Sequence, residues 1–236
     1  MANKKQLRNQ RTGTIINATS KKMEKNVMVA LQQTIEYVVE KFSVKLDHIS
    51  DLYLKDLVIE LQERYHDVDF SYKFGSSSMR PDGGILSIIS KDNIKYPILI
   101  TEVKNQGTND LRAKEGLKKQ AKGNAIERLG KNVIGFRTAL LHESIFPFVC
   151  FGDGCDFASD SSILDRVITI SMFGELNKIR VHNEGSNGIF NRGSFYFREK
   201  KWSVKEMVII MNDIAEKSVY YYFSKYGEDN FKEKKI

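Results

Sequence analysis

The sequence RPDGGILSIISKDNIKYPILITEVK, residues 80–104, predicts the central element of the protein. It holds two apolar runs, 85–90 and 94–103, and a polar segment at 91–93 separates them. Runs of this kind with a three-residue connection predict a β-hairpin. Pro97 lies inside the second run. Because proline cannot donate to a sheet ladder, we expect that strand to be kinked or unpaired on one side there.

Asp82 and Glu102 are expected to be neighbours, because a tight hairpin brings the start of one strand beside the end of its partner. Side chains two positions apart on a strand point to the same face. Glu102 and Lys104 therefore share a face, and Val103 is expected to point to the other side, into the core. An ordinary strand end with a Glu–Lys salt bridge would have the same pattern. Here, however, a proline precedes the aspartate, two glycines follow it and the chain is basic.

Two carboxylates and a lysine suit the hydrolysis of a phosphodiester. Mg²⁺ prefers oxygen ligands and keeps several waters when one or two carboxylates hold it. The ion polarises a phosphate oxygen and lowers the pKa of a bound water. The lysine can orient or deprotonate the attacking water and offset the phosphate charge. We therefore predict that Asp82 and Glu102 bind Mg²⁺ and that Lys104 assists the water.

The sequence on both sides of the hairpin predicts helices and further strands. Apolar residues recur at helical spacing over 26–42, and a second helix is expected after Ser50. Glu36, Glu40 and Glu60 lie on these helices, and whether one of them approaches the metal site is left open. The other predicted elements are a strand over 68–73, a helix over 117–141 that could begin only near Gly123, a buried strand over 145–151, a possible strand over 167–171, a Gly/Asn loop over 185–193 and a helix opened by a capping box at 203–206. Helices that alternate with a central group of strands predict one α/β domain with a mixed sheet.

The composition favours an anionic partner. The chain has 236 residues, a hydrophobic content of 41% and a formal net charge of +7. These values suit one domain with a sizeable core and favour nucleic acid over a membrane surface. No apolar run approaches the roughly 18 residues of a membrane span, and no secretion signal is expected. Cys150 and Cys155 are expected to be reduced thiols of a cytosolic protein, and the four histidines lack the spacing of a zinc site.

Residues 1–25 form a basic N-terminal segment. They hold seven basic residues and one acid, Glu24, and their apolar residues show no clear period. A solvated, partly disordered arm is expected. The alternative is an arm that contacts DNA phosphates and orders on binding. The predicted organisation is an arm over 1–25 and a single endonuclease domain over 26–236.

Three motifs occur in order along the chain. They are Arg80-Pro81-Asp82-Gly83-Gly84, Glu102-Val103-Lys104-Asn105-Gln106-Gly107 and Gly123-Asn124-Ala125-Ile126-Glu127-Arg128. In order and spacing they resemble the EcoRI-type restriction endonucleases, a branch of the PD-(D/E)XK nuclease superfamily. The first two motifs are shared by many nucleases, and the third is far more specific. The resemblance implies a restriction-endonuclease-like α/β fold with a central mixed five-stranded sheet flanked by helices. It also implies a Mg²⁺-dependent homodimer that cuts double-stranded DNA.

The resemblance assigns roles to individual residues. Asp82 and Glu102 would hold Mg²⁺, and Lys104 would be the third catalytic residue. The residues expected to read the bases of an AATT core and its flanks are Lys122, Gly123, Asn124, Ala125, Glu127, Arg128 and Arg166. The residues expected at the DNA backbone are Arg80, Asn105, Gln106, Lys118 and Lys119. The chemistry agrees, because asparagine bonds adenine bidentately, arginine donates to purine acceptors and alanine allows contact with a thymine methyl.

The base pairs outside the AATT core are left open. Ile163 stands where the EcoRI branch carries an arginine that helps to read the outer base pair, and Lys122 stands where a related branch that cuts CAATTG carries a basic residue. The site could be GAATTC, CAATTG, RAATTY or AATT alone. Two rival functions are a DNA repair or junction-resolving nuclease of the same superfamily and a DNA-binding module without catalysis. A restriction function would also imply a companion DNA methyltransferase and a prokaryotic cytoplasm.

Overall fold

The computed structural model describes residues 15–105, 116, 124–159, 161–171 and 175–232. Five strands form one mixed sheet in the order β1-β4-β5-β6-β7. The strands are β1 (Leu46–Ile49), β4 (Gly84–Ile89), β5 (Lys95–Asn105), β6 (Phe148–Asp153) and β7 (Ser194–Arg198). The pairs β1–β4 and β4–β5 are antiparallel, whereas β5–β6 and β6–β7 are parallel. A single α/β domain with a mixed five-stranded sheet is therefore confirmed.

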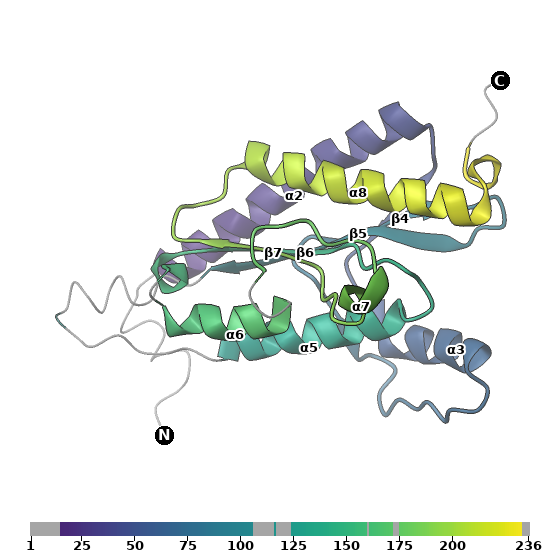
Figure 1. Cartoon of the computed structure of the whole chain (residues 1–236), viewed down its shortest axis with the longest axis horizontal. Helices are drawn as coiled ribbons and strands as arrows, with labels where there is room; N and C mark the ends of the chain where they lie inside the picture. The colour runs from purple at the N-terminus through teal and green to yellow at the C-terminus, as the bar shows by residue number, and fades with distance from the viewer. Residues whose placement is uncertain (1–14, 106–115, 117–123, 160, 172–174, 233–236) are drawn as a thin grey trace.

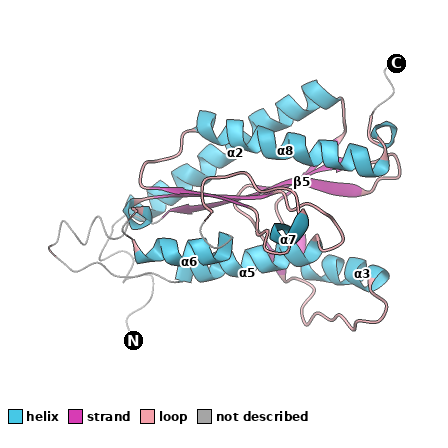
Figure 2. Ribbon diagram, viewed as in Figure 1, coloured by secondary structure: helices cyan, strands magenta, loops and turns pink. Residues whose placement is uncertain are grey.

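Helices cover both faces of this sheet (Figures 1 and 2). One face packs against α2 (Ile15–Phe42) and α8 (Val204–Tyr226), and the other packs against α5 (Asn124–Ala139) and α6 (Ser162–Ser171). The remaining elements are α3 (Leu54–Arg64), the one-turn α7 (Gly185–Gly188), two short 3-10 helices, η1 (Cys155–Phe157) and η2 (Glu228–Asn230), and a two-stranded ribbon of β2 (Leu52–Tyr53) and β3 (Ser78–Met79). Because both faces are covered, every residue of β4 and β6 is buried and no polar alternation appears. None of the described helices is long and apolar enough to cross a membrane.

The central hairpin follows the prediction closely. Its two strands pair from Gly84 opposite Thr101 to Ile89 opposite Lys95, and the register shifts between Leu86 and Ser87. Ser87 pairs with Pro97 and Leu86 with Leu99, so one extra residue sits in β5 directly after the proline. The expected irregularity at Pro97 is thus a local bulge, which moves the strand past a residue that cannot donate.

Two predicted strands are wrong. Residues 68–73 form a loop, in which the side chain of Gln62 hydrogen-bonds to Val68 O at 3.0 Å and to Phe70 N at 3.2 Å. That side chain satisfies backbone groups that a strand would have paired. Residues 167–171 are the end of helix α6, where Ile163 and Val167 are buried at helical spacing and face α5.

Several boundaries also differ from the prediction. The first helix is described from Ile15, so part of the segment expected to be an arm is helical, and Met23 lies in the core. The second helix begins at Leu54 because β1 and β2 occupy the residues before it. The Gly/Asn segment at 185–193 contains the one-turn α7, and β7 was not predicted. Helix α5 is described from Asn124, in line with the later expected start, and residues 117–123 lie outside the described part.

The capping box that opens α8 is confirmed. Ser203 Oγ accepts from Glu206 N at 3.3 Å, and Glu206 Oε2 accepts from Ser203 N at 3.0 Å. Trp202, directly before the cap, is buried and packs edge-on against Phe151 with ring centroids 5.5 Å apart. The start of α8 is therefore fixed to the sheet as well as capped.

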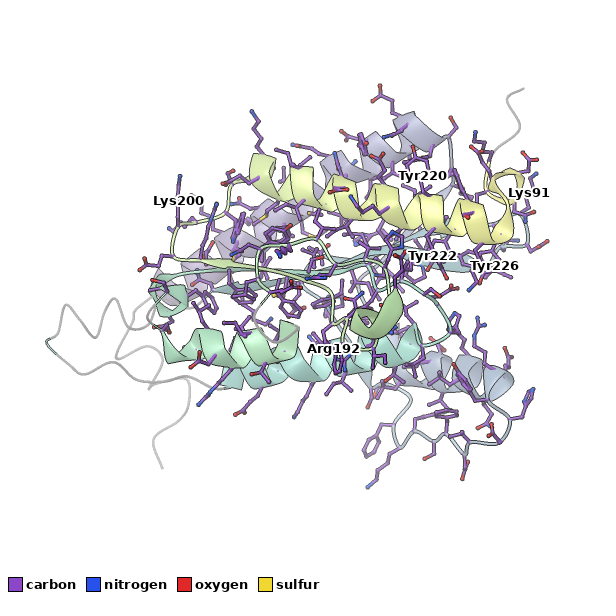
Figure 3. The ribbon with its side chains drawn as sticks, in the orientation of Figure 1. Lys91, Arg192, Lys200, Tyr220, Tyr222 and Tyr226 are labelled. Atoms are coloured by element: carbon purple, nitrogen blue, oxygen red, sulfur yellow. The ribbon has the colours of Figure 1, made fainter. Side chains whose placement is uncertain are left out.

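The other end of α8 is tied to the loop after α5 through a buried carboxylate, Glu143. Its side chain is 1% exposed and accepts hydrogen bonds from Tyr221 Oη at 2.8 Å, Tyr226 Oη at 2.9 Å and Lys225 Nζ at 2.6 Å. Tyr222, beside this group on the last turns of α8, donates to Pro97 O at 3.2 Å (Figure 3). These contacts hold the C-terminal helix to the loop after α5 and to the start of β5.

Candidate active site

The turn from Pro81 to Gly84 places Asp82 beside the end of β5. Gly84 N donates to Pro81 O at 3.0 Å, and Gly83 N donates to Thr101 O at 2.8 Å. Gly84 has φ = 77°, and a Cβ at this position would lie 2.3 Å from His48 Nε2. Only glycine meets both conditions, since it tolerates positive φ and has no side chain. The second glycine of the first motif is therefore required by the turn that carries Asp82.

Asp82 and Glu102 hold each other through the backbone. Asp82 N donates to Glu102 Oε2 at 3.3 Å, and Val103 N donates to Asp82 Oδ2 at 3.1 Å. Glu102 thus accepts a hydrogen bond from the backbone of Asp82, and Asp82 accepts one from the backbone of the residue after Glu102. The predicted proximity of the two acids is present, and Val103 is buried in the core on the α2/α8 side, as expected.

Lys104 lies between the two carboxylates. Its Nζ donates to Glu102 Oε1 and to Val103 O, the latter at 3.0 Å, and lies 3.5 Å from Asp82 Oδ2. The Glu102 side chain is 3% exposed and that of Lys104 is 16% exposed, whereas that of Asp82 is 30% exposed. The ammonium therefore offsets one of the two carboxylate charges, and Asp82 is the member nearest to solvent.

Burial and charge act in opposite directions on the pKa values of this group. Burial raises the pKa of Glu102, and Asp82 adds to the rise, while the charge and hydrogen bond of Lys104 oppose it. For Lys104, burial alone would lower the pKa, but the attraction of Glu102 and Asp82 outweighs it and the pKa is raised. Lys104 is thus held as an ammonium, which suits charge compensation and orientation of a ligand better than proton abstraction.

A cleft of about 220 Å³ opens beside these groups. It is lined by Met23 and Glu24 of α2, by Asp82, Lys104 and Asn105, and by Arg128 of α5. Arg128 and Asn105, predicted to contact a base and the DNA backbone, therefore border the same space as the catalytic candidates. The cleft joins the third motif to the first two.

The structure places the other predicted residues as follows. Asn124 and Ala125 begin α5, Glu127 is exposed on its first turn, and Arg166 is exposed on the neighbouring helix α6. Arg80 is 70% exposed at its side chain, with Nε 3.7 Å from Asp51 Oδ2. Gln106, Lys118, Lys119, Lys122 and Gly123 lie outside the described residues.

Two residues of the site were not predicted. Asn132, on α5, points its Nδ2 at Glu102 Oε1 from 3.5 Å. Asp153 ends β6 opposite Asn105, is 3% exposed, and accepts from Asn105 Nδ2 at 2.5 Å and from Trp202 N at 3.3 Å. The sequence could have indicated Asn132, because it lies four residues after Arg128 and therefore on the same face of the helix. Asp153 depends on strand register, which the sequence does not state.

The donor set fits a hard divalent cation. Within the described part of the chain, no group of three or more His, Cys, Asp or Glu side chains is placed to hold a metal, so the site offers two carboxylates. Of the helix glutamates, Glu24 borders the cleft, whereas Glu60 pairs with Arg64 and Glu36 accepts from Gln32. Asp82 and Glu102 bring two carboxylates against the single ammonium of Lys104, so the formal charge of the group is −1 (−2 + 1), which favours a cation. Oxygen-only ligands suit Mg²⁺ and related ions.

Comparison with known proteins agrees with this geometry. The family model described as Restriction endonuclease EcoRI matches residues 9–229. The chain is 30% identical over 177 residues to the Type II restriction enzyme RsrI of Cereibacter sphaeroides, which covers 61% of this chain and 64% of that protein. It is 29% identical over 180 residues to the Type II restriction enzyme EcoRI of Escherichia coli, which covers 61% of this chain and 65% of that protein. The matched part of the chain thus spans just under two thirds of the length of either relative.

Proposed function

Since the chain belongs to the EcoRI restriction endonuclease family, we propose that it is a type II restriction endonuclease that hydrolyses both strands of duplex DNA at a short palindrome. The observation that carries the proposal is the shared cleft. Asp82 and Lys104 line it, both hydrogen-bond to Glu102, and Arg128 of the third motif lines it as well. Cutting chemistry and base contact then occur at one place on the DNA.

Asp82 and Glu102 are the proposed Mg²⁺ ligands. When bound, the ion would supply positive charge that polarises a phosphate oxygen and makes a nearby water more acidic. Lys104 lies between the carboxylates, where its ammonium can offset phosphate charge and orient the attacking water. Water attacks phosphorus in line, the bond to the 3′ oxygen breaks, and that oxygen takes up a proton. The products are a 5′-phosphate and a 3′-hydroxyl.

The start of α5 is the proposed reader of an AATT core. Arg128 is exposed and borders the cleft, and Glu127 beside it can orient arginine side chains. Asn124 and Ala125 precede them in the first turn, where an adenine and a thymine methyl are suitable partners. Lys122, Gly123 and Arg166 are proposed to take part in base recognition as well. Arg80, Asn105, Gln106, Lys118 and Lys119 are proposed to contact the DNA backbone, and the outer base pairs are left open.

A palindromic site fits a symmetric protein. A homodimer would apply the same cleft to both strands, with its two-fold axis on that of the DNA. A basic N-terminal arm followed by the endonuclease domain is part of the proposal, and contact of the arm with DNA phosphates is left open. A companion methyltransferase that protects host DNA and a prokaryotic cytoplasm belong to the same proposal.

The direct test is to incubate the protein with plasmid DNA and Mg²⁺ and to sequence the ends of the fragments. Cuts at one palindrome with an AATT core are expected. Random nicking would instead favour a repair or junction-resolving nuclease, and binding without any cutting would favour a DNA-binding module. Sequenced ends would also give the flanking bases and the position of the cut.

Lys104→Ala tests the site assignment. The variant should bind the cognate duplex but cut it at least about 100-fold more slowly, because it lacks the charge next to the reacting phosphate. Lys95→Ala is the matched control, since Lys95 lies at the other end of the same strand and pairs with Asp47 at 2.9 Å. Normal cutting by Lys104→Ala would show that the site has been assigned to the wrong residues.

Arg128→Ala tests the reader. Loss of an arginine that donates to a purine should weaken specific binding by about 1–3 kcal/mol and relax the preference at one base position. Competition between the cognate duplex and duplexes with single base changes measures both effects. An equal loss of affinity for all sequences would place Arg128 on the phosphates instead.

A further inference from the structure

Asn132 faces the catalytic carboxylate from the helix that carries the proposed base-reading residues. Its Nδ2 lies 3.5 Å from Glu102 Oε1, and its side chain is half-buried between α5 and the hairpin. Residues four apart on a helix share a face. Asn132 therefore lies one turn beyond Arg128, on the side of α5 that borders the cleft.

The contact from Asn132 differs in origin from the other contacts of Glu102. Lys104 Nζ and Asp82 N, which also donate to this carboxylate, both belong to the hairpin and its turn. Asn132 belongs to α5, whose inner side packs through Leu129 and Val133. The amide thus forms a polar link between the helix and the carboxylate of β5.

The contact between Asn132 and Glu102 is longer than an ordinary hydrogen bond. Hydrogen bonds from nitrogen to oxygen usually measure 2.7–3.2 Å, so a 3.5 Å contact lies about 0.3 Å beyond the range. A small movement of α5 toward the hairpin would complete the bond. Helix α5 is a packed element, so force on its first turns from bound DNA would reach Asn132 through the helix itself.

We propose that Asn132 is a positioning residue, whose amide orients Glu102 for metal binding and completes its hydrogen bond when the start of α5 docks on the cognate bases. The proposal rests on the proposed function, and it adds a link between base reading and the metal ligand. Groups that donate to a ligating carboxylate fix its orientation, and their loss commonly costs about 10–100-fold in metal affinity or activity.

Asn132→Leu and Asn132→Ala remove the amide donor, and both residues favour the helix. Thr138→Ala is the matched control, because Thr138 lies on α5 and its hydroxyl donates to Ile134 O of the same helix. Three quantities are compared for each variant. They are the dissociation constant for Mn²⁺ by electron paramagnetic resonance, the affinity for the cognate duplex in EDTA, and the single-turnover cleavage rate.

Both Asn132 variants should bind Mn²⁺ about tenfold more weakly and cleave the cognate duplex at least about tenfold more slowly. Their affinity for DNA without metal should stay within about threefold of the wild type, and Thr138→Ala should match the wild type throughout. The rate advantage of the cognate duplex over a duplex with one altered base should also shrink, because docking no longer orients Glu102.

Wild-type Mn²⁺ affinity and cleavage in both Asn132 variants would overturn the inference and leave the nuclease function intact. A loss confined to DNA affinity would also overturn it and make Asn132 a DNA contact. If the wild type cuts no duplex, the proposed function fails. A weaker Mn²⁺ affinity in the Asn132 variants would then still support the link to Glu102.

Discussion

Glu102→Gln and Asp82→Asn each remove one negative charge with almost no change in shape, yet the structure predicts that only the first weakens the fold. Glu102 accepts hydrogen bonds through both oxygens, from Lys104 at Oε1 and from Asp82 N at Oε2. A glutamine has one acceptor oxygen, so its NH₂ must face one of these donors. With Glu102 only 2% exposed, water cannot take the place of the lost acceptor.

The size of the effect follows from this mismatch. A buried donor left without an acceptor costs about 1–3 kcal/mol, so Glu102→Gln should lower the free energy of unfolding by that amount. Asp82 accepts from Val103 N through one oxygen, Oδ2, and its side chain is 30% exposed. An asparagine oxygen can keep this bond while its NH₂ turns to the cleft. The change for Asp82→Asn should therefore stay within about 1 kcal/mol.

Urea unfolding followed by tryptophan fluorescence measures this difference directly, because Trp202 is the single tryptophan and is buried. Both variants should lose cleavage, so the contrast lies in stability alone. Equal stability of the two variants would show that the fold does not depend on Glu102 accepting hydrogen bonds through both of its oxygens. A Glu102→Gln protein more stable than the wild type would mean that the cost of burying the charge exceeds the value of its hydrogen bonds.

Three further variants test other parts of the structure. Gly84→Ala should destabilise the fold by at least about 1–2 kcal/mol and reduce cleavage, because its Cβ would meet His48 at a position of positive φ; a neutral result in urea unfolding would contradict the described turn. Glu143→Ala should cost about 1–3 kcal/mol, since it removes the buried acceptor of Tyr221 and Tyr226; a thermal unfolding midpoint equal to that of the wild type would rule this out. Hydrogen bonds from Arg198 and Ser203 lower the pKa of Glu206 from 4.5 to about 2, so its contribution to stability is full above about pH 4.5 and is lost as the pH falls through about 2. The difference in urea midpoint between wild type and Glu206→Gln should therefore shrink steadily below about pH 4.5, and a constant difference would count against this assignment.

The hairpin and its three site residues could be predicted because they depend on local chain geometry. A three-residue connection leaves few registers, and alternation along β5 then decides which side chains share a face with Glu102. The irregularity at Pro97 and the capping box at Ser203 are equally local, since each follows from the chemistry of one or two residues. Local rules of this kind placed Asp82 beside Glu102 correctly.

The errors come from parts of the chain where a distant partner decides the structure. Residues 68–73 alternate like a strand, but Gln62 takes up backbone groups there and the segment stays a loop. Val167 and Ile170 are apolar because α6 packs on α5, and so short a segment does not reveal whether its apolar residues repeat with the period of a helix or of a strand. Asp153 lies at the site because β6 pairs with β5 in a parallel register that puts Asp153 opposite Asn105, and only the folded sheet defines that register.

The four-residue spacing of Arg128 and Asn132 has a consequence for changing the sequence preference that we propose for this protein. Suppose that the start of α5, the proposed base reader, is replaced or lengthened so that the helix after it is rotated about its axis. Asn132 would then point away from Glu102, even if every new base contact were correct. One inserted residue rotates the helix by about 100°, which is enough to separate the two side chains. Engineered readers should therefore keep the number of residues between the base contacts and Asn132, and vary only side chains within that frame.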